Sequence, residues 1–283
     1  MKPLRTAYDY KVICYPNGTI QIRHYDKYMT HVLTDKMLGY EAHPFGYDED
    51  IIFNPFDFHE CKEVDKFKSK SKSLSTDDAR QRSYARTRQA IFTYARCANW
   101  EWFITLTFAS DKVDRYDFDE CSKKARVWLN NVRRLYAPDL QYVLVPELHK
   151  DGAIHFHGVL SRCGDIPFTD SGKTDRKGNQ IYNMDKWRFG WSTATKVKDI
   201  NKVSKYIGKY VTKQLCDTVS GKQRYYVSQN LPLPKVETYF FGYDWDLDSV
   251  VGMICDKYNK TVAHVSSTKA TEVYTKVDYV ELI

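Results

Sequence analysis

The stretch LQYVLVPELHKDGAIHFHGVLS (residues 140–161) predicts a β-hairpin with chemically active side chains on one face. Two β-rich runs flank a Lys-Asp-Gly turn, which is a strong hairpin signal. Residues two apart on a strand share a face. His155 and His157 therefore point the same way, while Phe156 points to the opposite face and toward the core.

The length of the turn decides whether Glu147 joins the two histidines. A two-residue loop, Asp151-Gly152, would pair Leu148 with His155 and send Glu147 to the opposite face. A three-residue loop that starts at Lys150, with Gly152 in the left-handed conformation, would place Glu147 directly opposite His155. A metal site on this hairpin requires the three-residue loop.

Two imidazoles and one carboxylate suit a divalent ion that keeps open positions for a substrate oxygen. A structural zinc ion would instead need four protein ligands, commonly including cysteine, and the nearest thiol in the sequence is that of Cys163. The plainer alternative is an ordinary hairpin with two histidines on its wet face. Glu147, His155 and His157 are the candidate ligands.

The segments around this hairpin predict an α+β fold. Strands are expected at 102–110, 140–149, 153–161 and 186–197, and helices at 76–97, 117–139 and 199–215. The turn-rich segment 164–180 reads as an exposed loop. This order describes an antiparallel sheet with helices on one face, of the ferredoxin-like type.

The remaining segments suggest three parts of the chain. An Asn17-Gly18 turn between alternating runs predicts an N-terminal hairpin, followed by a basic, Ser-rich connector. We expect an N-terminal region at 1–85, a central domain at 86–220 and a C-terminal extension at 221–283, the last irregular or β.

The helix expected at 199–215 carries a second candidate cluster. Tyr206 and Tyr210 are four residues apart and would be neighbours on one helix face. Lys202, Lys209 and Lys213 fall near the same face at 100° per residue. A phenol has a pKa of about 10, and adjacent ammonium groups favour the phenolate and attract a phosphate. The alternative is that the tyrosines only flank the core and the lysines are solvated.

The charge pattern is that of a protein with an anionic partner. The formal net charge is +7, and residues 183–213 hold eight Lys or Arg against two Asp, Arg188 and Lys205 among them. Cations follow phosphates and aromatic rings stack on bases, so this surplus favours nucleic acid. The seven scattered cysteines form no CxxC pair. No apolar run of about 18 residues exists and the start shows no secretory pattern, so we expect a cytoplasmic protein without a membrane span.

Together these motifs resemble the HUH endonucleases, specifically the rolling-circle replication initiators of microvirus and gokushovirus phages and related plasmids. The strand FITLTF (Phe103–Phe108) is similar to the first motif of that family, HFH with ELHKDG to the second, and KYIGKYVTK to the third, two-tyrosine motif. The resemblance covers about Trp102 to Lys213.

The resemblance implies a metal-assisted tyrosine nuclease. Glu147, His155 and His157 would hold Mg²⁺ or Mn²⁺, and Tyr206 or Tyr210 would attack the scissile phosphate, leaving a 5′-phosphotyrosyl link and a free 3′-OH. Lys209 would support the nucleophile or the phosphate. The expected DNA-binding residues are Lys202, Lys205, Lys213, Arg188, Thr105 and Thr107.

The implied partner is a single-stranded DNA origin in a bacterial host cell. No GxxxxGK[ST] nucleotide-binding signature is present, so a host helicase and polymerase are expected partners. Three alternatives stay open: a non-catalytic nucleic-acid-binding module with a similar sheet, an HUH relaxase or transposase, and a hairpin whose metal is only structural.

Overall fold

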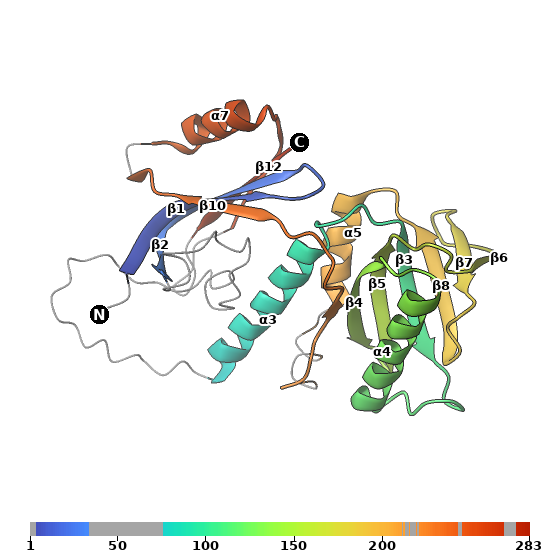
Figure 1. The fold of residues 1–283 in the computed structure, drawn as a ribbon. Coiled ribbons are helices and arrows are strands. Elements are labelled where there is room, and N and C mark those ends of the chain that lie inside the picture. The colour runs from blue at the N-terminus through green and yellow to red at the C-terminus, as the bar shows by residue number, and fades with distance from the viewer. Residues whose placement is uncertain are drawn as a thin grey trace. The chain divides into compact units, whose positions relative to one another are not determined.

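The computed structural model describes residues 4–33, 76–210, 212, 215, 219, 221–242, 245–268 and 276–283 (Figure 1). Its contacts divide the chain into two compact units, 1–73 with 233–283, and 74–232. Both units contain an antiparallel sheet with at least one helix, so the α+β class is confirmed. No helix in the described part of the chain is long and apolar enough to cross a membrane.

The first unit joins the two ends of the chain in one five-stranded sheet. Its strands lie in the order β10-β1-β2-β12-β11. The hairpin predicted at Asn17-Gly18 is present, and Gly18 has a φ of 84°. The elements are β1 (Leu4–Cys14), β2 (Ile20–Leu33), β10 (Lys235–Tyr239), α7 (Leu247–Tyr258), β11 (Val262–Ser267) and β12 (Val277–Leu282).

Helix α7 packs on one face of this sheet. Its Val250 and Ile254 are buried against alternate strand residues, which include Val12, Ile22 and Val280. The expected division into 1–85, 86–220 and 221–283 therefore differs from the structure. The N-terminal hairpin and the C-terminal segment form a single unit because β1 pairs with β10 and β2 pairs with β12.

The second unit contains a seven-stranded antiparallel sheet in the order β6-β7-β8-β3-β5-β4-β9. The strands predicted at 102–110, 140–149, 153–161 and 186–197 correspond to β3, β4, β5 and β8. The elements are α3 (Thr76–Tyr94), β3 (Trp102–Phe108), α4 (Phe118–Leu135), β4 (Gln141–Leu148), β5 (Ile154–Ser161), β6 (Phe168–Thr174), β7 (Gln180–Met184), β8 (Gly190–Lys196), α5 (Ile200–Ile207), the 3-10 helix η1 (Gly208–Tyr210) and β9 (Tyr226–Val227).

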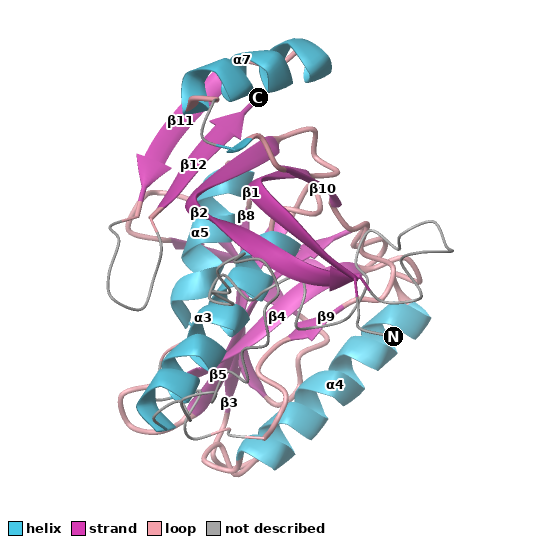
Figure 2. Ribbon diagram, turned by 90° about the vertical axis from the view of Figure 1, so that its left-hand side faces the viewer, coloured by secondary structure: helices cyan, strands magenta, loops and turns pink. Residues whose placement is uncertain are grey.

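Residue alternation gives this sheet two different faces. Ile104, Leu106 and Phe108 point to one face and are buried with the apolar stripe of α4, which includes Trp128 and Leu129. The opposite face carries the polar residues of β3 and is reached by η1, whose Tyr210 ring stacks on His157. Helices therefore flank both faces of the sheet, not one as expected (Figure 2).

Two other expectations for this unit were wrong in detail. The predicted loop at 164–180 contains β6 and pairs with β7 as a hairpin across the turn at Asp175 and Gly178. Its strand residues are largely exposed and polar, so no hydrophobic alternation marks them. The helix expected at 199–215 ends at Ile207 and tightens into η1.

Gly158 on β5 is required by close packing, and we expect Gly158→Ala to destabilise the unit by about 1–3 kcal/mol. An added Cβ would lie 2.8 Å from Leu144 Cδ1 and 2.9 Å from the carbonyl oxygen of Val143. Chemical denaturation of the purified variant measures the loss. Gly208→Ala is the matched control, since a Cβ added at Gly208 would have no neighbouring atom within 4 Å. Equal stability of the two variants would contradict the packing argument.

Candidate nuclease site

The hairpin turn has the three-residue form that the metal hypothesis requires. His149 N–H donates to the Ala153 carbonyl at 2.9 Å, and Gly152 has a φ of 88°. Lys150, Asp151 and Gly152 therefore form the loop, and Glu147 lies directly opposite His155 in the register of β4 and β5. The carboxylate and both imidazoles share one face of the sheet.

Threonines of β3 orient both imidazoles. Thr107 faces His155 and Thr105 faces His157 across the β3–β5 ladder. The Thr105 Oγ1 lies 3.1 Å from His157 Nδ1, and the Thr107 Oγ1 lies 3.3 Å from His155 Nδ1. A partner at Nδ1 fixes the ring and leaves Nε2 for a ligand, as in the outer shell of metal sites. The two threonines thus support the histidines, one of the roles that their position on the strand suggested.

The Glu147 carboxylate is in direct contact with one imidazole. Its Oε2 lies 2.6 Å from His157 Nε2. Burial raises the pKa of Glu147, but the hydrogen bond and charge of His157, with His155 and His149, lower it below its ordinary value overall. Burial and the neighbouring histidines lower the pKa of His155. Both shifts favour an ionised carboxylate and a neutral imidazole, which are the forms that bind a metal.

The three predicted ligands lie on adjacent positions but do not converge on one point. Within the described ranges, no group of three or more His, Cys, Asp or Glu side chains could hold a metal ion as placed. The His155 ring stacks on His149, with centroids 5.0 Å apart, and His157 turns toward Glu147 and Tyr210. The donor chemistry of the set fits Mg²⁺ or Mn²⁺. Ligation by this set stays a prediction.

Both predicted tyrosines lie against this cluster. The Tyr210 ring is stacked on the His157 ring at 3.6 Å with an interplanar angle of 9°. Tyr206 meets Tyr210 edge-on at 5.3 Å and is 46 % exposed. Phe103 of β3 contacts both phenol rings. The motif spacing thus predicted that the phenols lie near the histidines, although Phe103 was not identified as the residue that packs against both of them.

The predicted environment of the phenols is only partly present. Burial, a hydrogen bond with Tyr206 and the charges of Tyr206 and Glu147 raise the pKa of Tyr210, so the expectation that lysines favour its phenolate was wrong. Lys202 pairs with Asp199 at 3.0 Å. Lys209 lies 5.7 Å from the Tyr206 ring centroid, and Lys205 is exposed. Lys213 lies outside the described residues.

A comparison with protein-family models finds a match that covers this site. Residues 101–215 match the family described as replication-associated protein, ORF2 and gene 2 protein type. The matched segment is that of a replication-associated protein. It contains the candidate ligands and both tyrosines. Searches of curated proteins and of solved structures gave no significant match.

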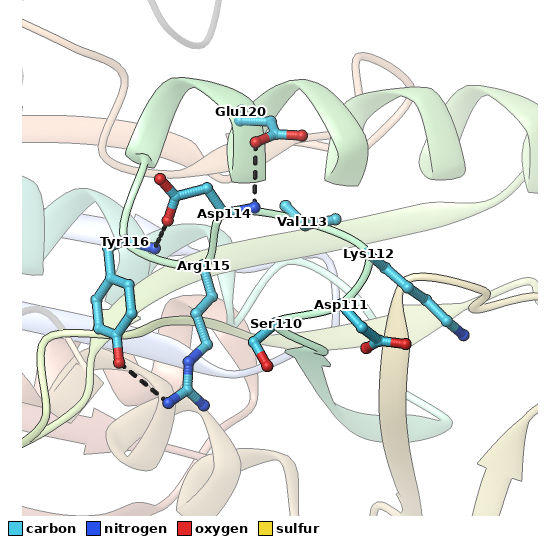
Figure 3. Close-up of a pocket in the computed structure, with 8 residues that line it drawn as sticks. All are labelled: Ser110, Asp111, Lys112, Val113, Asp114, Arg115, Tyr116 and Glu120. Carbon is cyan, nitrogen blue, oxygen red and sulfur yellow. Dashed lines mark hydrogen bonds between the residues drawn. The ribbon is translucent and has the colours of Figure 1, made fainter.

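The replication-associated segment has a shallow pocket beside the hairpin turn, formed by residues 110–116 and Glu120 (Figure 3). Glu120 accepts from the Asp114 N–H at 3.2 Å and closes the segment on α4. Arg115 pairs with Asp151 of the turn at 3.2 Å, and its carbonyl accepts from Ile154 at 2.7 Å. These contacts brace the turn that sets the register of Glu147.

Proposed function

We propose that this protein initiates rolling-circle replication by nicking and rejoining single-stranded DNA at an origin. The replication role rests on the family match of residues 101–215. The nicking chemistry rests on one observation, the stacking of Tyr210 on His157 with Tyr206 at its edge. Two phenols beside a Glu-His-His set are what a two-step strand transfer uses.

In the first step one phenol oxygen attacks the scissile phosphorus. The P–O3′ bond breaks, a 5′-phosphotyrosyl bond forms, and the 3′-oxygen takes up a proton as the phenol loses one. No water enters, so the phosphodiester energy is kept for rejoining. A Mg²⁺ or Mn²⁺ ion held by Glu147, His155 and His157 would polarise the phosphate. Lys209 lies beside Tyr206 and favours the negative charge that develops there.

In the second step the other phenol cuts the regenerated origin. The two rings lie 5.3 Å apart, close enough to serve the same phosphate position in turn. The free 3′-OH primes synthesis by a host polymerase, and a host helicase opens the duplex in the bacterial cytoplasm. Lys202, Lys205, Lys213 and Arg188 are proposed contacts to the DNA backbone.

The experiment incubates the purified protein with labelled single-stranded circular DNA that carries the origin, with Mn²⁺ or with EDTA. We expect a protein–DNA adduct that survives boiling in detergent and forms only with the ion. DNA binding without an adduct would contradict the nuclease and favour a non-catalytic binding module.

Thr105→Val and Thr107→Val are expected to raise the Mn²⁺ concentration needed for half-maximal adduct formation by about 10-fold each, because each removes the Nδ1 partner of a candidate ligand. The titration of adduct rate against Mn²⁺ measures this. Thr193→Val is the matched control, since Thr193 lies on the same face opposite Thr105 and is exposed. An unchanged titration in the first two variants would show that the threonines do not orient ligands.

A further inference from the structure

Trp191 lies in the same row of the sheet as the candidate ligands. In the register of β8, β3, β5 and β4, Trp191 faces Thr107, Thr107 faces His155, and His155 faces Glu147. Directly paired residues share a face, and adjacent strands are about 4.8 Å apart. The Cα atoms of Trp191 and His155 are therefore separated by about 10 Å across the same face.

The indole of Trp191 is open to solvent. Its side chain is 68 % exposed, more than any other large apolar side chain in the part of the chain that the structure describes. Thr193, its neighbour on this face, is also exposed. Tryptophan carries a large apolar area that proteins ordinarily bury, so an exposed ring beside a candidate active site points to a ligand.

Cations lie at the same end of β8. Arg188 is exposed and precedes Trp191 by three residues. The Lys112 ammonium donates to the Arg188 carbonyl at 3.2 Å, which brings a second positive charge to this end of the strand. A flat ring for stacking beside positive charges for phosphates is the combination that binds single-stranded nucleic acid without reading its sequence.

We propose that Trp191 is the stacking platform for one base of the single-stranded DNA next to the scissile phosphate, with Arg188 and Lys112 at the neighbouring backbone. This inference rests on the proposed nicking function for the identity of the strand. The platform holds the DNA across β8 and β3, so that the adjoining phosphate lies over His155 and His157. Trp191 is thus a positioning residue, which acts through the placement of the DNA.

The test measures binding in EDTA, where no cleavage occurs, by fluorescence anisotropy of a labelled origin oligonucleotide. Trp191→Ala is expected to raise Kd about 10-fold with an unchanged salt dependence, and Trp191→Phe to stay within about 3-fold of the native value. Arg188→Ala is expected to weaken binding and to reduce the salt slope by about 1. Leu135→Ala is the control, because Leu135 is 55 % exposed on α4, which packs on the opposite face.

A second readout locates the stacked base. The fluorescent base 2-aminopurine is placed at successive positions near the nick, and quenching is expected at one position and lost in Trp191→Ala. Native affinity and quenching in Trp191→Ala would overturn the platform even if the protein forms adducts. Weakened binding in a protein that forms no adduct would support the platform while the nuclease fails. Absence of DNA binding by the native protein would overturn both.

Discussion

Replacement of both Tyr206 and Tyr210 by phenylalanine is expected to reduce covalent adduct formation by at least about 10³-fold, because no nucleophilic oxygen remains beside the Glu-His-His set. The Tyr210 ring stacks on His157 and the Tyr206 ring meets it edge-on, so each substitution removes only a hydroxyl from an aromatic cluster that can stay packed. Single-turnover formation of the detergent-resistant adduct is the measurement.

The single variants separate one nucleophile from two. Tyr206→Phe and Tyr210→Phe are each expected to keep adduct formation, with the label moved to the remaining tyrosine. Tyr182→Phe is the matched control, since Tyr182 pairs with Ala194 on the core face and packs against Trp102. An adduct that persists in the double variant would place the nucleophile elsewhere. Complete loss in one single variant would indicate a single-tyrosine enzyme, such as a relaxase or transposase.

Loss of a candidate ligand is the second large effect. Glu147→Gln keeps the size of the side chain and its place opposite His155 but removes the charge that a divalent ion needs. We expect Glu147→Gln and His155→Ala each to lower the adduct rate about 10²-fold or more at fixed Mn²⁺, because the ion polarises the phosphate. The rate over a range of Mn²⁺ concentrations, with DNA binding in EDTA as a parallel readout, measures the effect.

The parallel readout distinguishes catalysis from folding and from affinity. DNA binding in EDTA is expected to stay within about 3-fold of the native value in both variants, since the ion is absent from that assay. Glu120→Gln is the control, because it removes a carboxylate from α4 that accepts from the Asp114 N–H, away from the candidate ligands. If Glu147→Gln and His155→Ala formed adducts at the native rate, the ligand assignment would be contradicted and the hairpin would have a structural role.

The parts of the site that were predictable from sequence depend on local rules. Strand alternation placed His155 and His157 on one face, and the three-residue loop, which was one of two alternatives, placed Glu147 opposite His155. The position of the two phenols beside His157 followed from the motif spacing. Each of these features spans few residues, and the backbone geometry alone sets it.

The features that sequence reasoning missed depend on contacts between distant segments. The pairing of β2 with β12 joins residues that are more than 250 positions apart, and no local pattern indicates such a partner. The helix end at Ile207 follows from tertiary packing, since Tyr210 stacks on His157 from a 3-10 turn and not from a continuous helix. The burial that raises the pKa of Tyr210 follows from the same packing and outweighs the nearby lysines.

The most direct test of the central claim is the identity of the residue that carries the DNA. The native protein is reacted with origin-bearing single-stranded DNA and Mn²⁺, the adduct is digested with nuclease and protease, and the modified peptide is sequenced by mass spectrometry. We predict a 5′-phosphonucleotide on Tyr206 or Tyr210, absent when EDTA replaces the ion. A nucleotide on any other residue, or cleavage that yields only hydrolysed DNA ends, would contradict the tyrosine mechanism.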